Sequence, residues 1–375
     1  MTPPPVLADL TTLRLGGPAD RIVGTETADE LVSAVREADA VGEPVLVLGG
    51  GSNLVVPDEG FPGVVVRDLR RGITVEDGAG ACGGVSLRVP AGTPWEDVVE
   101  RAVAEGWVGV EALTGIPGST GATPVQNVGA YGQEVSGVVS TIRAWDRQRA
   151  RIRTFALVDL EFGYRTSVLK RSLRDATGEA SSFAPTPRYV VLDVGFQLRL
   201  GTLSTPIAYP ELASRLGVTV GQRAPLAEVR AAVLALRRSK GMVLDAADHD
   251  TWSAGSFFTN PVLPVADAAR LPDDAPRFAV RSWRPETTSG PSLGAVDESL
   301  VKTSAAWLIE HAGFTKGYGL PGPVGLSTKH VLALTNRGQG TTTALLALAR
   351  TVRDGVRERF GVELELEPVL VGARL

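Results

Sequence analysis

Leu48-Gly49-Gly50-Gly51-Ser52-Asn53-Leu54 is the stretch on which the fold assignment depends, and it follows an apolar run at 44–48 that predicts a buried strand. Three glycines after a strand allow backbone amides to turn toward one side, where they form a nest for an anion such as phosphate. A tight surface turn has a similar composition, and the spacing differs from the dinucleotide fingerprint. Taken alone, the stretch supports a phosphate loop and an ordinary turn about equally.

A second glycine-rich stretch, Gly115-Ile116-Pro117-Gly118-Ser119-Thr120-Gly121-Ala122, again combines glycines with hydroxyl side chains. It continues into Gln126-Asn127-Val128-Gly129-Ala130-Tyr131-Gly132. Two such loops in one module are harder to explain as unrelated turns. Together they favour a binding site for a phosphate-containing ligand in the N-terminal half of the chain.

Short strands and helices alternate through that half. Thr27 is the predicted N-cap of an amphipathic helix that extends to Ala40, and Thr93-Pro94-Trp95-Glu96 predicts a capping box for a helix to about Glu105. The predicted strands cover 21–24, 44–48, 63–67, 85–89, 141–146, 151–155 and 188–198. This order is typical of an α+β nucleotide-binding module rather than of a barrel or a helical bundle.

The C-terminal half predicts a second, smaller module. A helix at 226–238 connects the two modules, and the further predictions are helices at 304–312 and 345–360 and a strand at 362–372. Gly361 stands at the C-cap position of the second of these helices. The stretch 176–185 predicts an exposed loop, and 264–291 is a proline-rich and charged insertion.

Composition limits the classes of function. The 375 residues, 43% hydrophobic and 21% charged, are typical of a globular protein of two or three domains. The 38 basic residues are scattered among 42 acidic ones, so neither nucleic acid nor an anionic membrane is an expected partner. No signal peptide or membrane span is predicted. The one cysteine, Cys82, excludes an intrachain disulfide, so we expect a reducing compartment such as the cytoplasm and no metal site.

Two features of the C-terminal half offer candidate acids. Gly255-Ser256-Phe257-Phe258-Thr259-Asn260-Pro261 places a serine among aromatic residues without a nucleophile-elbow pattern, so Ser256 suits a proton donor better than a nucleophile. The alternative is a strand that turns through Asn-Pro. Glu363, Glu365 and Glu367 alternate along the last predicted strand and are expected to share one face, either on a solvated edge or toward a pocket.

These segments occur in the order found in one family. The chain resembles the UDP-N-acetylenolpyruvoylglucosamine reductases, flavoenzymes of bacterial peptidoglycan precursor synthesis, over nearly its whole length. The resemblance rests on Leu15-Gly16-Gly17-Pro18-Ala19, the 49–54 and 115–132 loops, Gly163-Tyr164-Arg165-Thr166-Ser167, the 255–261 segment, Trp307-Leu308-Ile309-Glu310 and the closing 360–372 segment.

The resemblance implies an α+β fold with an FAD-binding module of the vanillyl-alcohol-oxidase type, followed by a smaller substrate-binding domain. The expected domains are an FAD-binding module at 1–224 with two subdomains split near 75, a connecting helix at 225–242 and a substrate-binding domain at 243–361. The segment 362–375 is then expected to bring Glu367 to the active site. A monomer is expected.

The resemblance also implies a reaction. NADPH would reduce non-covalently bound FAD, which would deliver hydride to the enolpyruvyl methylene carbon of a UDP-linked sugar and leave UDP-N-acetylmuramate. Arg165 would contact the carboxylate side of the developing enolate, Glu367 would share in polarising it, and Ser256 would protonate the alpha carbon. Glu365 remains an alternative to Glu367, because Pro368-Val369-Leu370 follows where the family usually has Val-Arg.

The resemblance assigns the remaining site residues. The expected FAD-binding residues are Gly49, Gly50, Gly51, Ser52, Asn53, Gly115, Pro117, Gly118, Ser119, Gly121, Ala122, Asn127, Gly129 and Tyr131. The expected substrate-binding residues are Tyr164, Tyr209, Arg237, Lys240 and Asn260, with Tyr209 on a mobile loop that closes over the nucleotide. An ordinary loop aromatic and a surface lysine are the alternatives for Tyr209 and Lys240.

Two other functions compete with the reductase. An FAD-dependent oxidase on the same scaffold often tethers its flavin through histidine or cysteine, and residues 1–248 contain no histidine and one cysteine. A non-catalytic nucleotide-sugar-binding regulator would not need to retain all three catalytic residue types. Both alternatives are therefore less favoured than the reductase.

Overall fold

The computed structural model describes residues 6–76, 84–281, 294–373 and 375. The chain divides into two compact units. Unit 1 contains residues 19–51 and 62–243, and unit 2 contains residues 6–18, 52–61 and 244–375, each within the described ranges. Cys82 and residues 282–291 of the predicted insertion lie outside the described residues.

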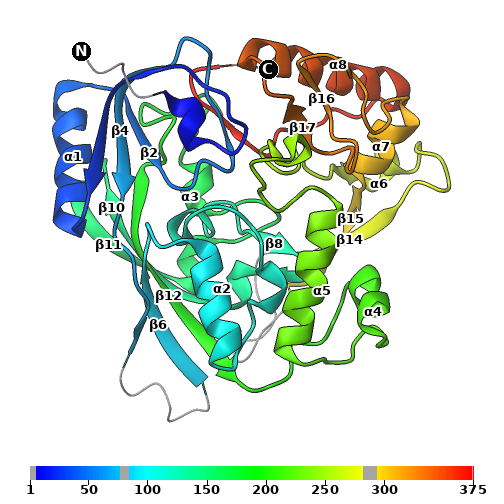
Figure 1. The fold of residues 1–375 in the computed structure, drawn as a ribbon, viewed down its shortest axis with the longest axis horizontal. Coiled ribbons are helices and arrows are strands. Elements are labelled where there is room, and N and C mark those ends of the chain that lie inside the picture. The colour runs from blue at the N-terminus through cyan, green and yellow to red at the C-terminus, as the bar shows by residue number, and fades with distance from the viewer. Residues whose placement is uncertain (1–5, 77–83, 282–293, 374) are drawn as a thin grey trace. The chain divides into compact units, whose positions relative to one another are not determined.

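The first sheet of unit 1 has the strand order β1 (Ala19–Thr25), β4 (Phe61–Asp68) and β2 (Val45–Leu48), with β2 and β4 parallel. Helix α1 (Ala28–Val41) packs against this sheet (Figure 1). Thr27 accepts a hydrogen bond from the Glu30 amide at the start of α1, and Gly42 ends the helix with φ +71°. The predicted strands at 21–24, 44–48 and 63–67 and the capped helix are confirmed.

The second sheet of unit 1 is antiparallel and carries the larger core. Its order is β11 (Arg151–Ala156), β10 (Val139–Asp146), β12 (Tyr189–Leu200), β6 (Gly84–Pro90) and β5 (Thr74–Val75), and β7 (Trp107–Val108) also pairs with β12. Helix α2 (Trp95–Ala104) buries Trp95 completely, and its ring centroid lies 5.9 Å from that of Phe196. The predicted strands at 85–89, 141–146, 151–155 and 188–198 are confirmed.

The predicted capping box at α2 is wrong. Pro94 rather than Thr93 is the N-cap, and no side chain caps the helix. The Glu96 carboxylate instead accepts hydrogen bonds from the Thr114 hydroxyl and the Gly115 amide. The backbone extends through Pro94 because Trp95 donates its amide to the Gly118 carbonyl, which ties the helix start to the second glycine-rich loop.

The rest of unit 1 consists of helices, one short hairpin and loops. Helix α5 (Leu226–Ser239) confirms the predicted helix at 226–238, and it packs beside α4 (Pro210–Leu216). The smaller elements are α3 (Val168–Arg171), the hairpin of β8 (Gly129–Ala130) and β9 (Gln133–Glu134), and 3₁₀ turns at Glu111–Leu113, Thr120–Ala122, Val135–Gly137 and Leu157–Leu160.

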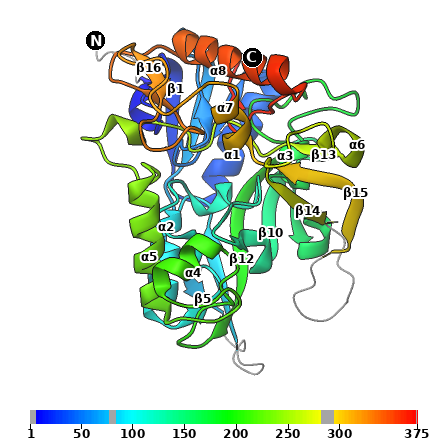
Figure 2. The same cartoon turned by 90° about the vertical axis from the view of Figure 1, so that its right-hand side faces the viewer.

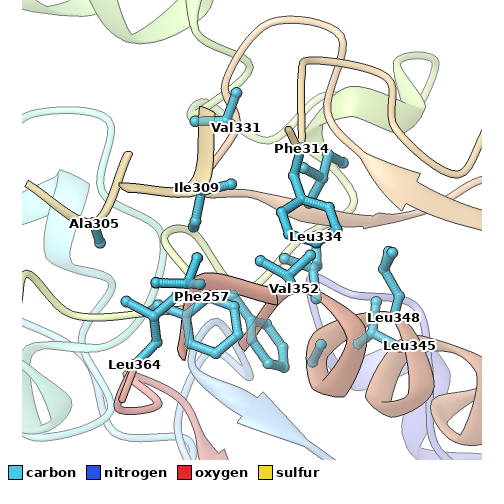
Figure 3. Close-up of a cluster of buried hydrophobic side chains, with 14 of the residues drawn as sticks. Phe257, Ala305, Ile309, Phe314, Val331, Leu334, Leu345, Leu348, Val352 and Leu364 are labelled. Atoms are coloured by element: carbon cyan, nitrogen blue, oxygen red, sulfur yellow. The ribbon is translucent and has the colours of Figure 1, made fainter. Parts of the chain in front are cut away.

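Unit 2 is built around the longest helix, α8 (Thr342–Phe360). Its apolar face packs with α7 (Ala305–His311) and with side chains from extended segments, among them Phe257, Leu334 and Leu364 (Figure 3). Gly361 ends α8 with φ +68°, which confirms the predicted C-cap. Unit 2 also contains a 3₁₀ turn at each of Leu7–Leu10 and His249–Thr251.

Three small sheets complete unit 2. β13 (Val262–Pro264), β15 (Val296–Thr303) and β14 (Arg277–Arg281) form one antiparallel sheet beside α6 (Val265–Ala268) (Figure 2). β16 (Val324–Leu326) pairs with β17 (Leu334–Asn336). The third sheet joins β18 (Val369–Leu370) to β3 (Leu54–Val55) in parallel, so a segment near the C-terminus lies beside one near the N-terminus.

The predicted strand at 362–372 is mostly wrong. Only Val369–Leu370 is a strand, and the preceding segment makes a single bridge between Leu366 and Phe258 before a bend at Glu367 and Pro368. A proline has no amide to donate to a ladder, so regular pairing stops there. Glu363 and Glu365 are exposed whereas Glu367 is half-buried, and the three carboxylates are therefore not in equivalent surroundings.

Asp58 holds the N-terminus of α8 from another part of the chain. Its carboxylate accepts hydrogen bonds from the amides of Thr342 and Thr343 and from the Thr343 hydroxyl. Burial alone would raise the pKa of Asp58, but these hydrogen bonds outweigh it and hold the pKa below its usual value of 3.8.

Asp58→Asn is expected to lower the free energy of unfolding by about 1–2 kcal/mol at neutral pH, because two helix amides lose a charged acceptor. Since the folded-state pKa is depressed, this stabilisation is complete above the unfolded pKa and is lost as the pH falls through the folded pKa. Urea unfolding from pH 7 to pH 3 measures this, with the exposed neighbour Glu59→Gln as control. A difference between wild type and variant that stays constant down to pH 3 would exclude the ionised carboxylate as the cause.

Candidate functional site

The two glycine-rich loops lie against each other in unit 1. A Cβ atom built on Gly50 would lie 2.6 Å from the Gly118 Cα, and one built on Gly49 would lie 2.4 Å from the Ser119 hydroxyl oxygen. These approaches are possible only without side chains at 49 and 50. The second loop carries φ values of +70° at Gly115 and +131° at Gly118. The two stretches that the sequence singled out therefore form one cradle of backbone.

The backbone donors of this cradle fall into two sets. The amides of Thr120, Gly121 and Ala122 donate to carbonyls of the chain at 2.8–3.1 Å. Within the described ranges, no backbone carbonyl accepts a hydrogen bond from a second set, formed by Gly50, Gly51, Gly118 and Ser119. Donors that are close together and lack a carbonyl partner fit an anionic group such as the pyrophosphate of FAD. The residues present therefore fit the cofactor that the sequence resemblance implies.

The remaining predicted cofactor residues are divided between the units. Pro117, Gly121 and Ala122 belong to the second loop, where a Cβ on Gly121 would meet the Ala91 side chain at 2.4 Å. Ser52 and Asn53 follow the first loop and belong to unit 2. The Asn53 side chain donates to the Glu367 carbonyl at 3.3 Å, and the Asn53 carbonyl accepts from the Val369 amide.

Arg165 lies in a tight turn of unit 1. Gly163 and Thr166 exchange two backbone hydrogen bonds, which places Tyr164 and Arg165 at the centre of the turn. The Arg165 guanidinium donates to the Gly129 carbonyl at 3.0 Å and to the Asn127 carbonyl at 3.5 Å, and it lies 5.6 Å from the centre of the Tyr164 ring. Arg165, Tyr164, Asn127 and Gly129 are thus brought together.

Backbone strain marks the same place. Asn127, Tyr131 and Arg165 have φ values of +48°, +49° and +53°, a region that residues with side chains rarely adopt. The buried Asn127 side chain binds Glu134, the Gly163 carbonyl and the Ser136 amide, which compensates for its strained backbone. Strain of this kind is often found at functional sites.

A second cluster of unit 1 joins Tyr131 to the predicted phosphate-binding residues. The Tyr209 ring packs edge-on against the Tyr131 ring at 5.3 Å, and the Lys240 ammonium lies 5.7 Å from the centre of the Tyr131 ring. Lys240 also forms an ion pair with Glu211, with Nζ and Oε2 2.5 Å apart. The structure therefore brings Tyr131, Tyr209 and Lys240 together, and it adds Glu211, which the sequence did not suggest.

Within the described residues, Arg237 has no carboxylate in hydrogen-bond contact, although the negative charge of Glu96 acts on it from further away. Its Nη2 donates to the Met242 carbonyl at 2.8 Å, and within the described ranges its buried Nε has no acceptor. Burial lowers the pKa of Arg237 to about 10, and the nearby positive charge of Arg165 contributes in the same direction, although Tyr131 acts against it. A desolvated positive charge of this kind is best stabilised by a bound anion.

Burial raises the pKa of the Tyr131 phenol, although Lys240 and Arg237 act in the opposite direction. For Lys240, burial favours the neutral amine, but the hydrogen bond to Glu211 and the surrounding charges outweigh this effect and raise the pKa. At neutral pH this cluster therefore consists of a neutral phenol beside charged Lys240 and Arg237.

Ser256 and Glu367 are placed by one pairing within unit 2. The Glu367 amide donates to the Phe257 carbonyl at 3.0 Å, and the Thr259 amide donates to the Glu365 carbonyl at 2.9 Å. This antiparallel register sets Glu367 beside the residue that follows Ser256, and it sets Glu365 further away, opposite Thr259. Glu365 is exposed, so the half-buried Glu367 is the better placed of the two.

Asn260 makes a structural contact with α7. Its side-chain oxygen accepts a hydrogen bond from the Ala305 amide at 2.9 Å, at the start of α7. The Ser304 hydroxyl caps the same helix through the Trp307 amide. Asn260 therefore fixes the start of α7 relative to the segment that carries Ser256.

Three acidic residues of unit 1 were not predicted to support the site. Glu96 holds the Gly115 amide, Glu134 holds Asn127, and Glu211 pairs with Lys240. The sequence signal for Glu134 was its position two residues after Gly132, in the turn that the glycine-rich stretch predicts. Glu96 and Glu211 each lie in the first turn of a helix, where an acidic residue is expected for local reasons, and so their tertiary contacts gave no signal.

Gly50→Ala is expected to abolish or strongly reduce flavin binding, because the new Cβ would lie 2.6 Å from the Gly118 Cα and would push the two loops apart. Gly137→Ala is the matched control, since no atom lies within 4 Å of a Cβ built there. The ratio of flavin to protein after purification measures the effect. A Gly50→Ala protein with a full complement of flavin would show that the cradle does not hold the cofactor.

Comparison with known proteins first defines the class. Residues 19–146 match the family described as FAD binding domain, so the chain is an FAD-binding protein of α+β fold. Residues 247–371 match the family described as UDP-N-acetylenolpyruvoylglucosamine reductase, C-terminal domain. No helix within the described ranges is long and apolar enough to cross a membrane.

The relatives then define the family. The chain is 52% identical to the UDP-N-acetylenolpyruvoylglucosamine reductase of Thermobifida fusca, covering 98% of this chain and 97% of the relative. It is 53% identical to that of Saccharopolyspora erythraea, covering 98% and 95%. The crystal structure of the reductase from Thermus caldophilus has the same fold, with a TM-score of 0.59 at 24% identity over 98% and 97% of the chains. The chain belongs to the UDP-N-acetylenolpyruvoylglucosamine reductase family, which confirms the resemblance and the predicted fold class.

Proposed function

We propose that this protein catalyses the NADPH-dependent reduction of UDP-N-acetylglucosamine enolpyruvate to UDP-N-acetylmuramate, a step in peptidoglycan precursor synthesis. The observation that carries the proposal is the backbone cradle of Gly49, Gly50 and Gly118 in a chain of this family. Within the described ranges, the Gly50 and Gly118 amides donate to no backbone carbonyl. The FAD is held non-covalently, since unit 1 contains no histidine for a covalent tether.

The cofactor-binding residues hold FAD mainly through backbone amide donors rather than through charged side chains. The amides of Gly50, Gly51, Gly118 and Ser119 bind the pyrophosphate, and the buried Asn127 side chain fixes the loop that leads to Gly129 and Tyr131. Ser52 and Asn53 bind the same cofactor from the end of the first loop.

When bound, FAD that NADPH has reduced supplies a hydride to the enolpyruvyl methylene carbon. Arg165 binds the carboxylate side of the substrate and stabilises the negative charge that develops there, because its guanidinium is oriented by the Gly129 and Asn127 carbonyls. Glu367 helps to polarise the same group. Ser256 then donates a proton to the alpha carbon.

The substrate diphosphate is bound by cationic and polar side chains. Lys240 is the point charge, Arg237 contributes a second positive charge from one helical turn earlier, and Tyr209 closes over the nucleotide. Tyr164 and Asn260 complete the set. The ligand is a small nucleotide sugar, and the protein acts as a monomer. The single cysteine supports a cytoplasmic location, and the scattered basic residues support the absence of nucleic-acid and membrane partners.

The absorption spectrum of the purified protein tests this function. We expect a yellow protein that releases its flavin on acid precipitation, is bleached by NADPH and regains its colour with the enolpyruvyl nucleotide sugar. A protein that reduces oxygen but not the enolpyruvyl sugar would favour the oxidase hypothesis. A protein that binds the sugar without any change in its spectrum would favour the non-catalytic regulator.

A further inference from the structure

We propose that the Glu211 carboxylate occupies the anion position beside Lys240 in the ligand-free enzyme and that a substrate phosphate must displace it. Glu211 thereby sets the affinity for the nucleotide and couples its arrival to a movement of α4. The inference rests on the role of Lys240 given under Proposed function, and the experiment below separates the two.

The contact that carries the inference is direct. The Glu211 Oε2 lies 2.5 Å from the Lys240 Nζ. The Glu211 side chain is 42% exposed to solvent, and the Lys240 side chain is 30% exposed. The pair is therefore open to solvent on one side. No other carboxylate in the described ranges forms an ion pair with Lys240. Among the charged and titratable groups, Glu211, Tyr131 and Tyr209 have the largest electrostatic influence on Lys240.

The position of Glu211 in the chain links this ion pair to the nucleotide loop. Tyr209 is the N-cap of α4 and Pro210 its first residue, so Glu211 lies in the first turn of the helix, two positions after Tyr209. The Tyr209 ring packs on the Tyr131 ring, over which the Lys240 ammonium also lies. Glu211 and Tyr209 therefore hold one segment against Lys240 and Tyr131 through two contacts.

The energetics favour displacement rather than permanent closure. An ion pair that is half exposed contributes little, because water and salt screen it. The diphosphate of a nucleotide sugar carries two negative charges whereas a carboxylate carries one, and it offers more acceptor oxygens to the same ammonium. Two anions at one ammonium repel each other, so binding of the phosphate moves Glu211, and with it Tyr209, out of the ligand-free arrangement.

The test compares Glu211→Gln with Glu228→Gln in the flavin-loaded enzyme. Both variants remove one negative charge, but Glu228 is an exposed residue near the other end of α5 and is no part of the Lys240 cluster. UDP is the probe, and its dissociation constant is measured by titration calorimetry at low salt and at high salt. We expect UDP to bind about two- to fivefold more tightly to Glu211→Gln than to wild type at low salt. The gain should disappear at high salt, and Glu228→Gln should match wild type.

A movement of α4 gives a second, independent readout. Amide hydrogen exchange in residues 210–216 is expected to be faster in Glu211→Gln than in wild type, and addition of UDP to wild type is expected to change the exchange of the same peptide. If Glu211 had only a local role at the surface, UDP would not change the hydrogen exchange of this peptide.

UDP binding by Glu211→Gln that equals or is weaker than that of wild type overturns the proposal. Lys240→Met then identifies the cause. If Lys240→Met weakens UDP binding about tenfold or more, as loss of a charge-assisted hydrogen bond to phosphate predicts, only the role of Glu211 fails. If Lys240→Met leaves UDP binding unchanged, Lys240 is a surface lysine and its role under Proposed function fails as well.

Discussion

Ser256→Ala is expected to slow reoxidation of the reduced flavin by the enolpyruvyl substrate about a hundredfold or more, while reduction of the flavin by NADPH stays fast. The reason is that the serine is proposed to deliver the proton to the alpha carbon and to have no part in binding FAD. Stopped-flow absorbance of the two half-reactions separates these effects.

Ser253→Ala provides the control for this experiment. Ser253 is buried three residues earlier in the same segment, and its hydroxyl accepts a hydrogen bond from the Gly255 amide. Its loss should affect stability more than the rate of either half-reaction. If the Ser256→Ala enzyme is folded, yellow and as fast as wild type, Ser256 has no role in the mechanism, and protonation must proceed through water near Arg165 or Glu367.

Arg165→Met is expected to lower kcat by about 10²–10³-fold without loss of flavin, because a fixed positive charge at the developing enolate is removed. Arg165→Lys should recover only part of the rate, since an ammonium cannot reproduce the two oriented hydrogen bonds to the Gly129 and Asn127 carbonyls. Steady-state rates at saturating substrate measure both variants.

The control for Arg165 lies a few residues along the chain. Arg171 forms an exposed ion pair with Glu161, so Arg171→Met should leave kcat within about twofold of wild type. An Arg165→Met enzyme that loses its flavin would instead indicate that the turn at Gly163 and Thr166 collapses. A rate equal to that of wild type would exclude Arg165 from the mechanism.

Much of the fold was predictable because local signals agreed with the tertiary structure. Thr27 and Gly42 fix both ends of α1, and the apolar spacing of α8 together with Gly361 fixes that helix. The start of α2 was mispredicted because the Glu96 carboxylate binds the Gly115 amide in another part of the chain. The capping pattern in the sequence is the same whether this carboxylate caps its own helix or makes a tertiary contact. The strand at 362–372 failed because Pro368 interrupts a pairing that alternation alone predicts to continue.

Only those parts of the candidate site that contain glycine-rich loops or family motifs could be predicted from the sequence. The two glycine-rich loops drew attention to the cradle, and the family motif drew attention to Arg165 and Ser256. No local pattern indicates that Glu211 faces Lys240, because the two residues lie on different helices and meet only through packing of α4 beside α5. The domain limits and the roles of the site residues stay predictions.

The parallel pairing of β3 with β18 has a consequence during protein synthesis. Leu13, Leu15 and Val55 leave the ribosome early, but the core they enter is otherwise formed by residues from Ala254 onward. Until that part of the chain has been translated, these apolar side chains lack most of their native partners, and exposed apolar side chains favour aggregation. Glu367 reaches its place beside the 257–259 segment only after both segments have been translated, so the role proposed for it cannot be filled before then.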